Sequence, residues 1–414
     1  MTQLASFIGT SLSKPIVRAR FAQDILQGAS SSMNPPVLIL SHSTEMRAAY
    51  GPPRMVSDYL SSRSIVHDFV HHSLYSNRKS VYERIGVRER PRQFGVVSFP
   101  SAFLGYFAQL VLTVCEVIRR KARYNVIIGV DPLNSATALI LRRIGFCKYV
   151  IFYAADYAFD RFSNRVMNAL YHILDRYCAH RSDYVWNVSL RITRIRSLQG
   201  VERERNLFVP NSVSCRQVRT LPESQTNRRL MIFVGHLGVA PEIDLILDTF
   251  PEILASVPDS KLLIVGSGPR SAELKKQIFS RGLASSIVML GELLHDDVLR
   301  LLSTCAIGIA LYSGKAPWTV FADSAKVREY VACGLPVIMN STPSTADDIR
   351  DYDAGIVIPL SKKNFLEAAI KLLRDDLFYA RLRTNALRMS REFDRDRILD
   401  EAFSRIDLPR SEPA

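Results

Sequence analysis

The sequence has few cysteines and histidines, and neither residue type stands in a metal-binding pattern. Its 414 residues include six cysteines and eight histidines, with no Cys-x-x-Cys pair and no histidine cluster. A zinc centre needs closely spaced thiolate and imidazole ligands, so the sequence predicts no metal site. Because no cysteines stand in a pairing pattern, we expect free thiols and a reducing cytoplasm.

Long apolar runs are also scarce. Residues 1–34 contain no acid before Asp24 and no continuous apolar core, which predicts a flexible or amphipathic extension rather than a secretory signal. The segment 99–118 is the one candidate for a membrane span, yet it contains Gln109 and Glu116. A buried helix is therefore favoured over a span. A helix that lies on a membrane surface stays open as an alternative.

Acidic residues are in the minority. The chain has 54 lysines and arginines against 40 aspartates and glutamates, a net charge of +14. This balance favours anionic partners, either nucleotide phosphates, lipid headgroups or nucleic acid. Nucleic acid is disfavoured because aromatic residues do not interleave with the basic ones and no recognition-helix pattern is found. Seven arginines between 191 and 219 would suit an anionic membrane or a phosphorylated acceptor, with a solvated basic face as the alternative.

The sequence does contain a repeated alternation of buried strands and helices. Strand-like runs at 37–42, 125–130 and 149–154 alternate with helix-like segments, and the alternation starts again after residue 229. A single core rarely exceeds about 250–300 residues. The pattern therefore predicts two α/β domains, each a doubly wound parallel sheet.

We predict five regions along the chain. They are a flexible extension at 1–34, a first Rossmann-like domain at 35–214, a linker at 215–228, a second Rossmann-like domain at 229–385, and a final helix and tail at 386–414. Ligands of such sheets bind at the carboxyl ends of the strands, so we expect the site in the cleft between the domains.

The most informative segment is 316–340. It reads as a loop, a short helix, the break Gly334-Leu335-Pro336 and a buried strand, which is the order that a parallel α/β layer requires. Asp323, Lys326 and Glu329 stand three residues apart, which places them on one helix face. That face would suit a ligand with hydroxyls and phosphates.

Segments of the second half occur in the same order as in a known enzyme family. The series VGHL, KLLIVGSGP, VMLGEL, AIGIALY, KVREYVACGLPVI and AGIVIP resembles the nucleotide-sugar domain of GT-B glycosyltransferases, most nearly the retaining family-4 group. In the first half, GVDPLN, YAADY and SDYVWNVS resemble the acceptor-side domain of some members. The run EFDRDRILDEAF resembles the helix that crosses back to the first domain in this fold. The resemblance implies a donor site on the second domain and an acceptor site on the first.

The resemblance also implies roles for single residues. Glu329 matches the second of two family glutamates and would accept hydrogen bonds from the ribose hydroxyls. The position of the first glutamate is Phe321 here, so Asp323 becomes the candidate for contact with the donor sugar. The run 323–330 resembles a divergent branch of the family with the pattern Asp-Pro-x-Lys-x-x-Glu-Tyr.

A second departure concerns the donor diphosphate. The Arg and Lys that neutralise it in the family are replaced here by His236 and Pro241. Negative charge on a departing diphosphate needs another partner in a water-poor cleft. Lys326 is the first candidate and Arg54 the second, with help from backbone N–H groups at helix N-termini.

Several further candidates keep two interpretations each. Gly235, Gly266 and Gly268 would allow a phosphate to approach the backbone, but a Gly-x-Gly after a strand is also an ordinary tight turn. His236 would contact phosphate or be a hydrogen-bonded turn residue. Asp156, which follows a strand of the first domain, would face the acceptor or cap the next helix.

Together these features predict a retaining, hexosyl-type glycosyltransferase in the cytoplasm, with association to an anionic membrane surface left open. It would move a sugar from a nucleotide-diphosphate sugar to a glycan or lipid-linked acceptor, without a metal or separate cofactor, in polysaccharide or glycoconjugate biosynthesis. Asp323, Lys326 and Asp156 are the catalytic candidates. Two alternatives remain, namely an epimerase or phosphorylase of the same fold, and a non-catalytic sugar-nucleotide- or glycan-binding protein that lost turnover with the Arg-Lys pair.

Overall fold

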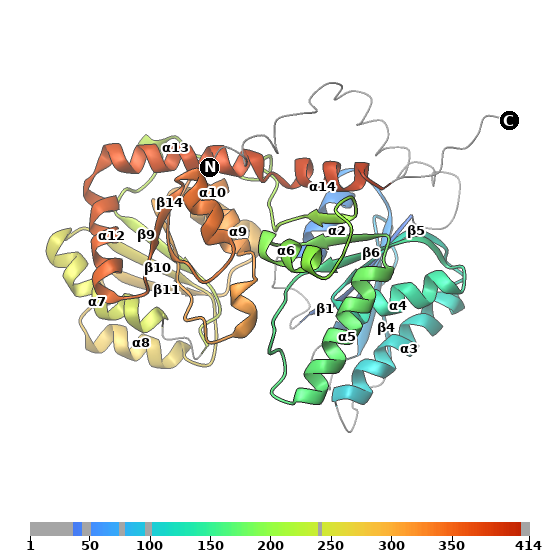
Figure 1. The fold of residues 1–414 in the computed structure, drawn as a ribbon. Helices are drawn as coiled ribbons and strands as arrows, with labels where there is room; N and C mark the ends of the chain where they lie inside the picture. The colour runs from blue at the N-terminus through green and yellow to red at the C-terminus, as the bar shows by residue number, and fades with distance from the viewer. Residues whose placement is uncertain (1–35, 44–50, 74–78, 96–101, 239–241, 407–414) are drawn as a thin grey trace.

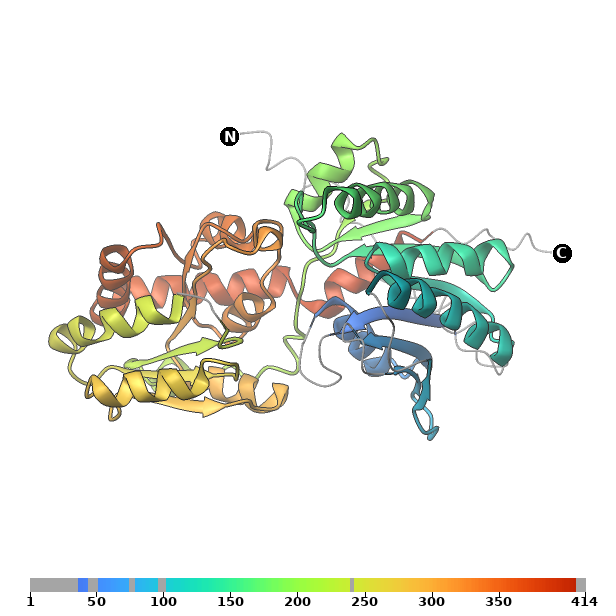
Figure 2. The same cartoon turned by 90° about the horizontal axis from the view of Figure 1, so that it is seen from below.

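The computed structural model describes residues 36–43, 51–73, 79–95, 102–238 and 242–406. These residues form two α/β lobes that lie side by side (Figure 1). The predicted extension at 1–34 falls outside the described residues. Each lobe contains one twisted sheet with helices packed against it, as the predicted fold class requires (Figures 1 and 2).

The first sheet has eight strands in the order β4-β3-β2-β1-β5-β6-β7-β8. Its strands are β1 (Val37–Ser43), β2 (His67–Ser73), β3 (Ser80–Ile85), β4 (Arg92–Phe94), β5 (Tyr124–Val130), β6 (Cys147–Ala154), β7 (Tyr184–Asn187) and β8 (Asn206–Phe208). The central strand β1 has four successive side chains at 0% exposure, because helices cover both faces of the sheet.

The first sheet is not wholly parallel. Strand β3 pairs antiparallel with β2, and β4 pairs antiparallel with β3, while the remaining pairs are parallel. Only six residues separate Ser73 from Ser80, which is too short for the crossover helix that a parallel neighbour requires. The prediction of a parallel sheet is therefore corrected at this edge.

Three helices lie side by side on one face of the first sheet (Figures 1 and 2). They are α3 (Ala102–Arg120), α4 (Pro132–Arg143) and α5 (Arg165–Arg181), and α4 packs against both neighbours. Helix α2 (Pro52–Ser62) packs on β1 and β2, and α6 (Leu190–Leu198) packs on β7 and β8.

Helix α3 contains most of the segment predicted as a buried helix. No helix within the described ranges combines the length and the apolarity needed to cross a bilayer. However, α3 lies in the outer layer of the lobe, so only one of its sides meets the core. Phe107 on its other side is 60% exposed. The prediction of a buried helix is thus corrected to an amphipathic one.

The second sheet has six parallel strands in the order β11-β10-β9-β12-β13-β14. They are β9 (Leu230–Val234), β10 (Lys261–Val265), β11 (Ile287–Gly291), β12 (Ile307–Ala310), β13 (Val337–Asn340) and β14 (Gly355–Ile358). Its two faces are covered by α7 (Glu242–Ser256), α8 (Ser271–Ser280) and α12 (Lys362–Arg374), and by α9 (His295–Thr304), α10 (Ala325–Ala332) and α11 (Thr345–Tyr352). Helix α13 (Asp376–Glu392) contributes buried side chains to both clusters.

Each sheet has a point where the direction of strand addition reverses. In the first sheet the chain adds β2, β3 and β4 on one side of β1, and then places β5 on the other side. In the second sheet it adds β10 and β11 on one side of β9, and then places β12 on the other. The loops after the two strands at such a point lead away to opposite sides and leave a crevice between them. The two crevices are therefore expected after β1 and β5, and after β9 and β12.

The chain returns to the first lobe at its end, where α14 (Arg395–Ser404) packs beside α2 (Figure 1). Phe403 is buried against Tyr59 and Trp186, with ring centroids 5.6 and 5.1 Å away. The Tyr59 hydroxyl donates to the carboxylate of Asp400 at 2.7 Å. The last helix therefore completes the core of the first lobe, although the second lobe lies between them in the sequence.

The crossing begins later than the predicted boundary at 385/386. That boundary falls inside α13, because Ala386 and Met389 are still buried in the second lobe. The chain changes direction at Asp394, which caps α14. The same carboxylate accepts a hydrogen bond from the backbone N–H of Cys215, which lies in the segment between the two sheets.

Replacing Phe403 tests whether α14 belongs to the first core. Phe403→Ala should lower the free energy of unfolding of the first lobe by about 3–5 kcal/mol, because it leaves a cavity under two aromatic rings. Urea denaturation followed by fluorescence measures this change. Leu377→Ala, at a side chain that is 87% exposed, is the control and should change stability by less than about 0.5 kcal/mol. Equal effects of the two substitutions would contradict the packing described.

Candidate functional site

The candidate site lies in the crevice of the second sheet, where β9 and β12 end and α10 packs against β12. The hydroxyl of Ser324 caps α10 by accepting the N–H of Val327, and it lies 2.6 Å from the hydroxyl of Tyr312. Gly334 ends the helix with a φ of +80°, a conformation that glycine adopts without strain. These end points hold α10 so that Lys326 and Glu329 lie beside the crevice.

Lys326 is a cation without an ion pair in the described part of the chain. Its Nζ lies 4.9 Å from the ring centroid of Phe233 and 4.8 Å from that of Tyr312, and no ion pair joins it to a carboxylate of the described residues. Burial lowers its pKa to about 8, although the charges of Glu242 and Glu329 act in the opposite direction. A half-buried ammonium that has no ion-pair partner is a group that an incoming anion would stabilise.

Glu329 has one oxygen engaged with its neighbour. Its Oε1 lies 3.0 Å from Nε2 of His295, at the start of α9, and its side chain is 7% exposed. Burial lowers the pKa of His295, but the hydrogen bond and charge of Glu329, with the charges of Asp296 and Asp58, raise it overall. The His295 imidazole therefore favours the charged form, in which it donates to Glu329.

The influence of Asp58 on His295 places the first lobe across from this site. Asp58 belongs to α2, whereas His295 belongs to the second lobe. Arg54, the second candidate for the diphosphate, lies on the same helix, is 60% exposed and pairs with Asp58 at 3.4 Å. The contact of Arg54 with a diphosphate stays a prediction, because in this structure its guanidinium pairs with Asp58 instead.

Asp323 does not point toward a donor, which corrects the role predicted for it. Its side chain is 1% exposed, and its carboxylate accepts hydrogen bonds from Arg328, from Thr345 and from the backbone N–H of Asn211 in the first lobe. The reason is that Asp323 precedes the cap of α10 rather than lying on the helix. It therefore does not share the face of Lys326 and Glu329.

The glycines after β10 are required by packing. A side chain at Gly266 would collide with the carbonyl oxygen of Gly235, and one at Gly268 would collide with the carbonyl of Leu237. The backbone N–H of Leu237 donates to Ser267 at 2.9 Å, so the two loops support each other. This geometry favours the structural-turn interpretation over direct phosphate contact.

Gly235 itself lies at the crevice. A Cβ added there would be 3.3 Å from Nζ of Lys326, so the absence of a side chain leaves space beside the ammonium. His236 is exposed, and its contact with phosphate stays a prediction.

Glu242 is a carboxylate that sequence reasoning missed. It begins α7, is 5% exposed, and its Oε1 accepts the backbone N–H of Ser313 after β12. Its Oε2 has no partner within the described part of the chain. The sequence did contain a signal for Glu242, because it directly follows Pro241, the residue that replaces the family's lysine.

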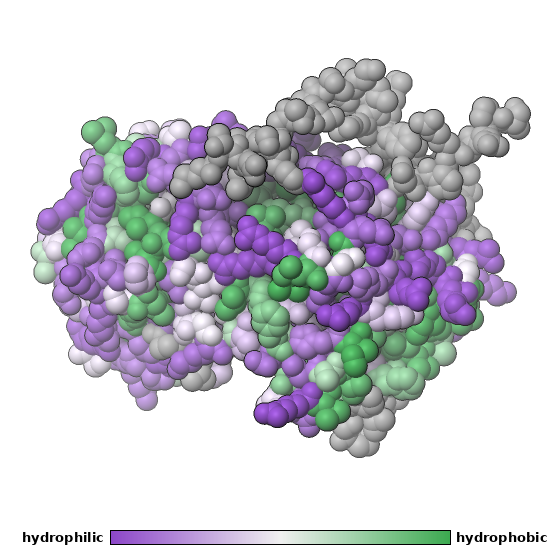
Figure 3. Space-filling model, viewed as in Figure 1, coloured by the Kyte–Doolittle hydropathy of each residue, from purple (hydrophilic) through white to green (hydrophobic). Residues whose placement is uncertain are grey.

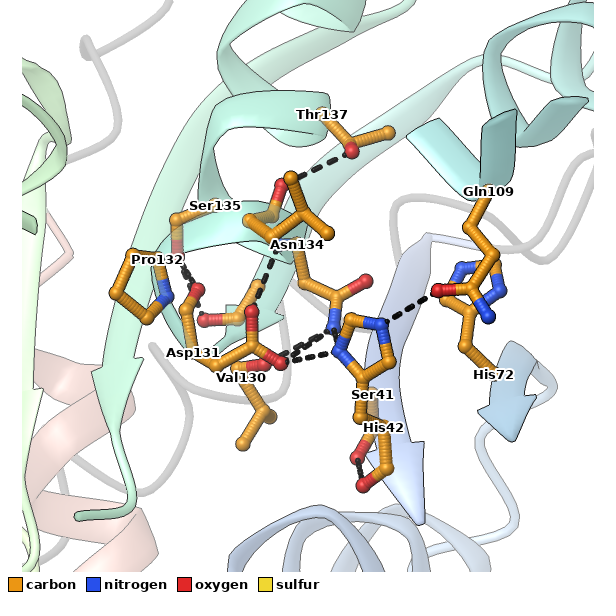
Figure 4. A network of polar contacts seen from close by, with 12 residues as sticks. Ser41, His42, His72, Gln109, Val130, Asp131, Pro132, Asn134, Ser135 and Thr137 are labelled. Atoms are coloured by element: carbon orange, nitrogen blue, oxygen red, sulfur yellow. Dashed lines mark hydrogen bonds and ion pairs between the residues drawn. The ribbon is translucent and has the colours of Figure 1, made fainter. Parts of the chain in front are cut away.

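A second polar cluster occupies the crevice of the first sheet, and it was also missed. His42 at the end of β1, Asp131 after β5 and Asn134 on α4 point toward one another (Figure 4). His42 Nδ1 lies 2.6 Å from Asp131 Oδ2, and His42 Nε2 lies 2.9 Å from the side-chain oxygen of Gln109. Asp131 also accepts the backbone N–H of Asn134 at 2.9 Å and has a φ of +87°, which is rare for a residue with a side chain.

In the pair of His42 and Asp131, each residue favours the charged form of the other. Burial lowers the pKa of His42, while the charge of Asp131 and the hydrogen bonds to Asp131 and Gln109 raise it overall. Burial raises the pKa of Asp131, and its contacts with His42 and Asn134 lower it overall. His42 and Asp131 therefore form a partly buried ion pair at the edge of the crevice. The Asp-Pro start of α4 gave a signal for Asp131, but pairing with His42 depends on the strand order.

Asp156 lies at the carboxyl end of β6, next to β5, and pairs with Arg161 at 2.7 Å. Asn164, not Asp156, caps the next helix, α5. The capping alternative is therefore excluded, and a role toward an acceptor stays a prediction. The charge of Arg161 also acts on His42 and on Asp131, which places this pair beside the first cluster.

The second lobe matches a known family. Residues 228–375 match the family described as Glycosyl transferases group 1. Alpha-D-kanosaminyltransferase of Streptomyces kanamyceticus is 21% identical over 150 residues, which cover 36% of this chain and 37% of that protein. The sequence match therefore spans little more than a third of the relative.

The likeness to solved structures extends over both lobes. The Anabaena protein HepE in complex with UDP is 15% identical with a TM-score of 0.61, over 89% of this chain and 98% of that one. Sucrose-phosphate synthase from Thermosynechococcus elongatus is 14% identical with a TM-score of 0.63, over 90% of this chain and 96% of that one. The chain has the GT-B fold, and its second lobe matches the group 1 glycosyl transferase family over residues 228–375. At these identities the likeness establishes the fold alone.

In this GT-B chain, Phe321 stands where the family has its first glutamate, and it helps to join the two lobes. Phe321 packs edge-on against Tyr157 and Phe159 of the first lobe, with ring centroids 5.2 and 5.4 Å away. The carbonyl of Phe321 accepts the hydroxyl of Ser189 at 2.7 Å. In the described part of this GT-B protein no group of three or more His, Cys, Asp or Glu side chains could hold a metal ion.

The unpaired ammonium of Lys326 should cost stability. Because its pKa is about 8 in the folded state and about 10.5 when unfolded, the wild type should become more stable as the pH rises between these values. Lys326→Met should raise the free energy of unfolding at pH 7 by on the order of 1 to 3 kcal/mol. The gain should shrink toward zero above pH of about 10. Urea denaturation at several pH values measures this, and a destabilised Met variant at pH 7 would contradict it.

Proposed function

We propose that the protein transfers a sugar from a nucleotide-diphosphate sugar to a hydroxyl group of a glycan or lipid-linked acceptor. The observation that carries the proposal is the unpaired ammonium of Lys326 beside Glu329, in the crevice of a group 1 domain. A diphosphate would supply the missing counter-charge. The complex of the Anabaena neighbour with UDP supports a nucleoside diphosphate as the donor's leaving group.

Each residue of the second crevice has a task in this proposal. Lys326 would neutralise the diphosphate in the bound donor and, more strongly, as it departs. Glu329 would accept a ribose hydroxyl with the oxygen that His295 does not hold, and His295 would keep the carboxylate in place. Glu242 would accept a hydroxyl of the donor sugar through its unpartnered Oε2.

The first crevice would receive the acceptor. His42 and Asp131 satisfy each other, so the pair would orient neighbouring groups rather than exchange protons, and Asp156 with Arg161 would extend the polar rim. We propose a retaining transfer of a hexose in the cytoplasm. The bond from the anomeric carbon to the leaving phosphate breaks, the bond to the acceptor oxygen forms on the same face, and a phosphate oxygen takes the acceptor's proton. No side chain is then required as a nucleophile.

A non-catalytic sugar-nucleotide-binding protein is the second candidate, and a specific observation favours it. The Arg and Lys expected after β9 are replaced by His236 and Pro241, so neutralisation of the diphosphate would fall to Lys326, with Arg54 as the second candidate. Isothermal titration and donor turnover separate the two functions. With UDP-, GDP-, ADP- and dTDP-sugars, steady release of nucleoside diphosphate supports an enzyme. Tight binding without any release, in the presence of glycan and lipid-linked acceptors, supports the binding protein.

Glu329→Ala provides the site-specific test. It should weaken donor binding by on the order of 1 to 3 kcal/mol if the carboxylate holds the ribose. The matched control is Glu273→Ala on α8, which replaces an exposed glutamate of the same lobe and should leave the affinity unchanged. A folded Glu329→Ala variant that binds the donor like the wild type would exclude the ribose contact.

The pKa of Lys326 predicts how donor binding depends on pH. Bound diphosphate favours the charged ammonium, so affinity should be constant below a pH of about 8 and fall by up to about tenfold per pH unit above it. Isothermal titration between pH values of about 6.5 and 9.5 measures the profile. Lys326→Arg stays charged throughout and should remove the decline. The same decline in both proteins would show that another group is responsible.

A further inference from the structure

The outer side of α5 presents a row of exposed apolar side chains. Val166, Leu170, Ile173 and Tyr177 are between 48% and 68% exposed. They stand at positions i, i+4, i+7 and i+11, which lie on one face of a helix. Single exposed apolar residues are ordinary on protein surfaces, but a continuous row marks a contact surface.

The neighbouring helices extend this surface. Phe107 and Val111 on α3 are 60% and 40% exposed, and α4 lies between α3 and α5. Figure 3 shows apolar, green surface over the part of the first lobe where α5 and α3 lie. We call the exposed side of these three helices the α3–α5 face.

The charged residues of these three helices are mostly positive. The three helices contain seven arginines and two acids. Both acids are buried in ion pairs, Glu116 with arginines of its own helix and Asp175 with Arg196. Arg165 and Arg176 are exposed beside the apolar row. A partner for this face must therefore offer both apolar and anionic groups.

We propose that the α3–α5 face docks on the surface of an anionic lipid bilayer. The apolar row would enter the boundary between headgroups and acyl chains, and the arginines would meet lipid phosphates. A second copy of the chain is a poorer partner, because pairing this face with itself would oppose like charges. No described helix can span the bilayer, and the contact proposed is with the bilayer surface.

The docking geometry leaves the crevices accessible. Helices that connect parallel strands run antiparallel to them. The outer sides of α4 and α5 therefore face away from the sheet, whereas the crevices open at the carboxyl ends of the strands. A bilayer along the side of the lobe would therefore not cover the crevice. This inference does not rest on the proposed catalytic function.

Vesicle sedimentation of the full chain tests the proposal. The protein should sediment with phosphatidylcholine vesicles that contain about 30% phosphatidylglycerol, and at least about fivefold less with phosphatidylcholine alone or in about 0.5 M salt. Leu170→Ser with Ile173→Ser, and separately Arg165→Ser with Arg176→Ser, should each reduce binding at least about fivefold. All four side chains are exposed, and thermal melting checks that the variants fold.

The control removes equally exposed apolar side chains from the second lobe. Phe279 and Leu377 are 80% and 87% exposed, and Phe279→Ser with Leu377→Ser should leave vesicle binding unchanged. Absence of binding by the wild type, or equal loss in this control, overturns the proposal. So does a dimer, seen by light scattering without lipid, that the Leu170 and Ile173 substitutions convert to a monomer.

A fluorescent reporter tests the docking face directly. Ile173→Trp should shift its emission to the blue with anionic vesicles and be quenched by lipids brominated on their acyl chains. Phe279→Trp should show neither effect, because it lies on the second lobe. The difference from the wild-type spectrum removes the contribution of the two native tryptophans. A quenched Phe279→Trp with an unquenched Ile173→Trp would contradict the orientation.

Discussion

One buried carboxylate, that of Asp323, links the two lobes at their junction. Asp323 accepts a backbone hydrogen bond from Asn211 in the first lobe and neutralises Arg328 in the second, while its own carbonyl accepts the Asn211 side chain. A buried charge is tolerated only when its hydrogen bonds are complete, and here they are completed from both sides of the junction. Phe321, two residues earlier, adds apolar contact with the first lobe. The same short segment then leads into α10, so the junction of the lobes and the position of Lys326 are set together.

This coupling shapes the electrostatics of the site. Around Asp323 the charges are held in ion pairs, because Arg328 contacts both Asp323 and Asp348, whereas a few residues earlier than Arg328 the ammonium of Lys326 has no ion-pair partner among the described residues. Unsatisfied groups that a fold tolerates are typical of binding sites, where a ligand completes them. Glu242, with one oxygen unpartnered, is an acidic group whose charge acts on Lys326. The second lobe thus combines a rigid frame with a cation and a carboxylate oxygen, Lys326 and Glu242 Oε2, for which the described residues supply no ion-pair or hydrogen-bond partner.

The regular elements could largely be predicted from the sequence, because buried strands and amphipathic helices have local signatures. The parallel second sheet follows the predicted alternation strand by strand, and α10 ends just before Gly334, the glycine predicted to stop it. The β3–β4 hairpin was missed because its short, polar strands resemble loops. The predicted role of Asp323 was wrong because the prediction applied helical spacing to this residue, which lies just before the cap of α10 and outside the helix. Glu242 and the His42–Asp131 pair were missed because each depends on contacts between segments far apart in sequence.

The sequence by itself determined the two-lobe α/β class, the excess of positive charge and the residue types near α10, since these follow from composition, periodicity and local capping. Only the tertiary structure decided which of these residues share a crevice. Strand order places β1 beside β5 and β9 beside β12, and this brings His42 to Asp131 and Glu242 to Ser313. It also decided which sides of α3 and α5 remain exposed. Such contacts depend on topology and burial, which no local pattern of residues encodes.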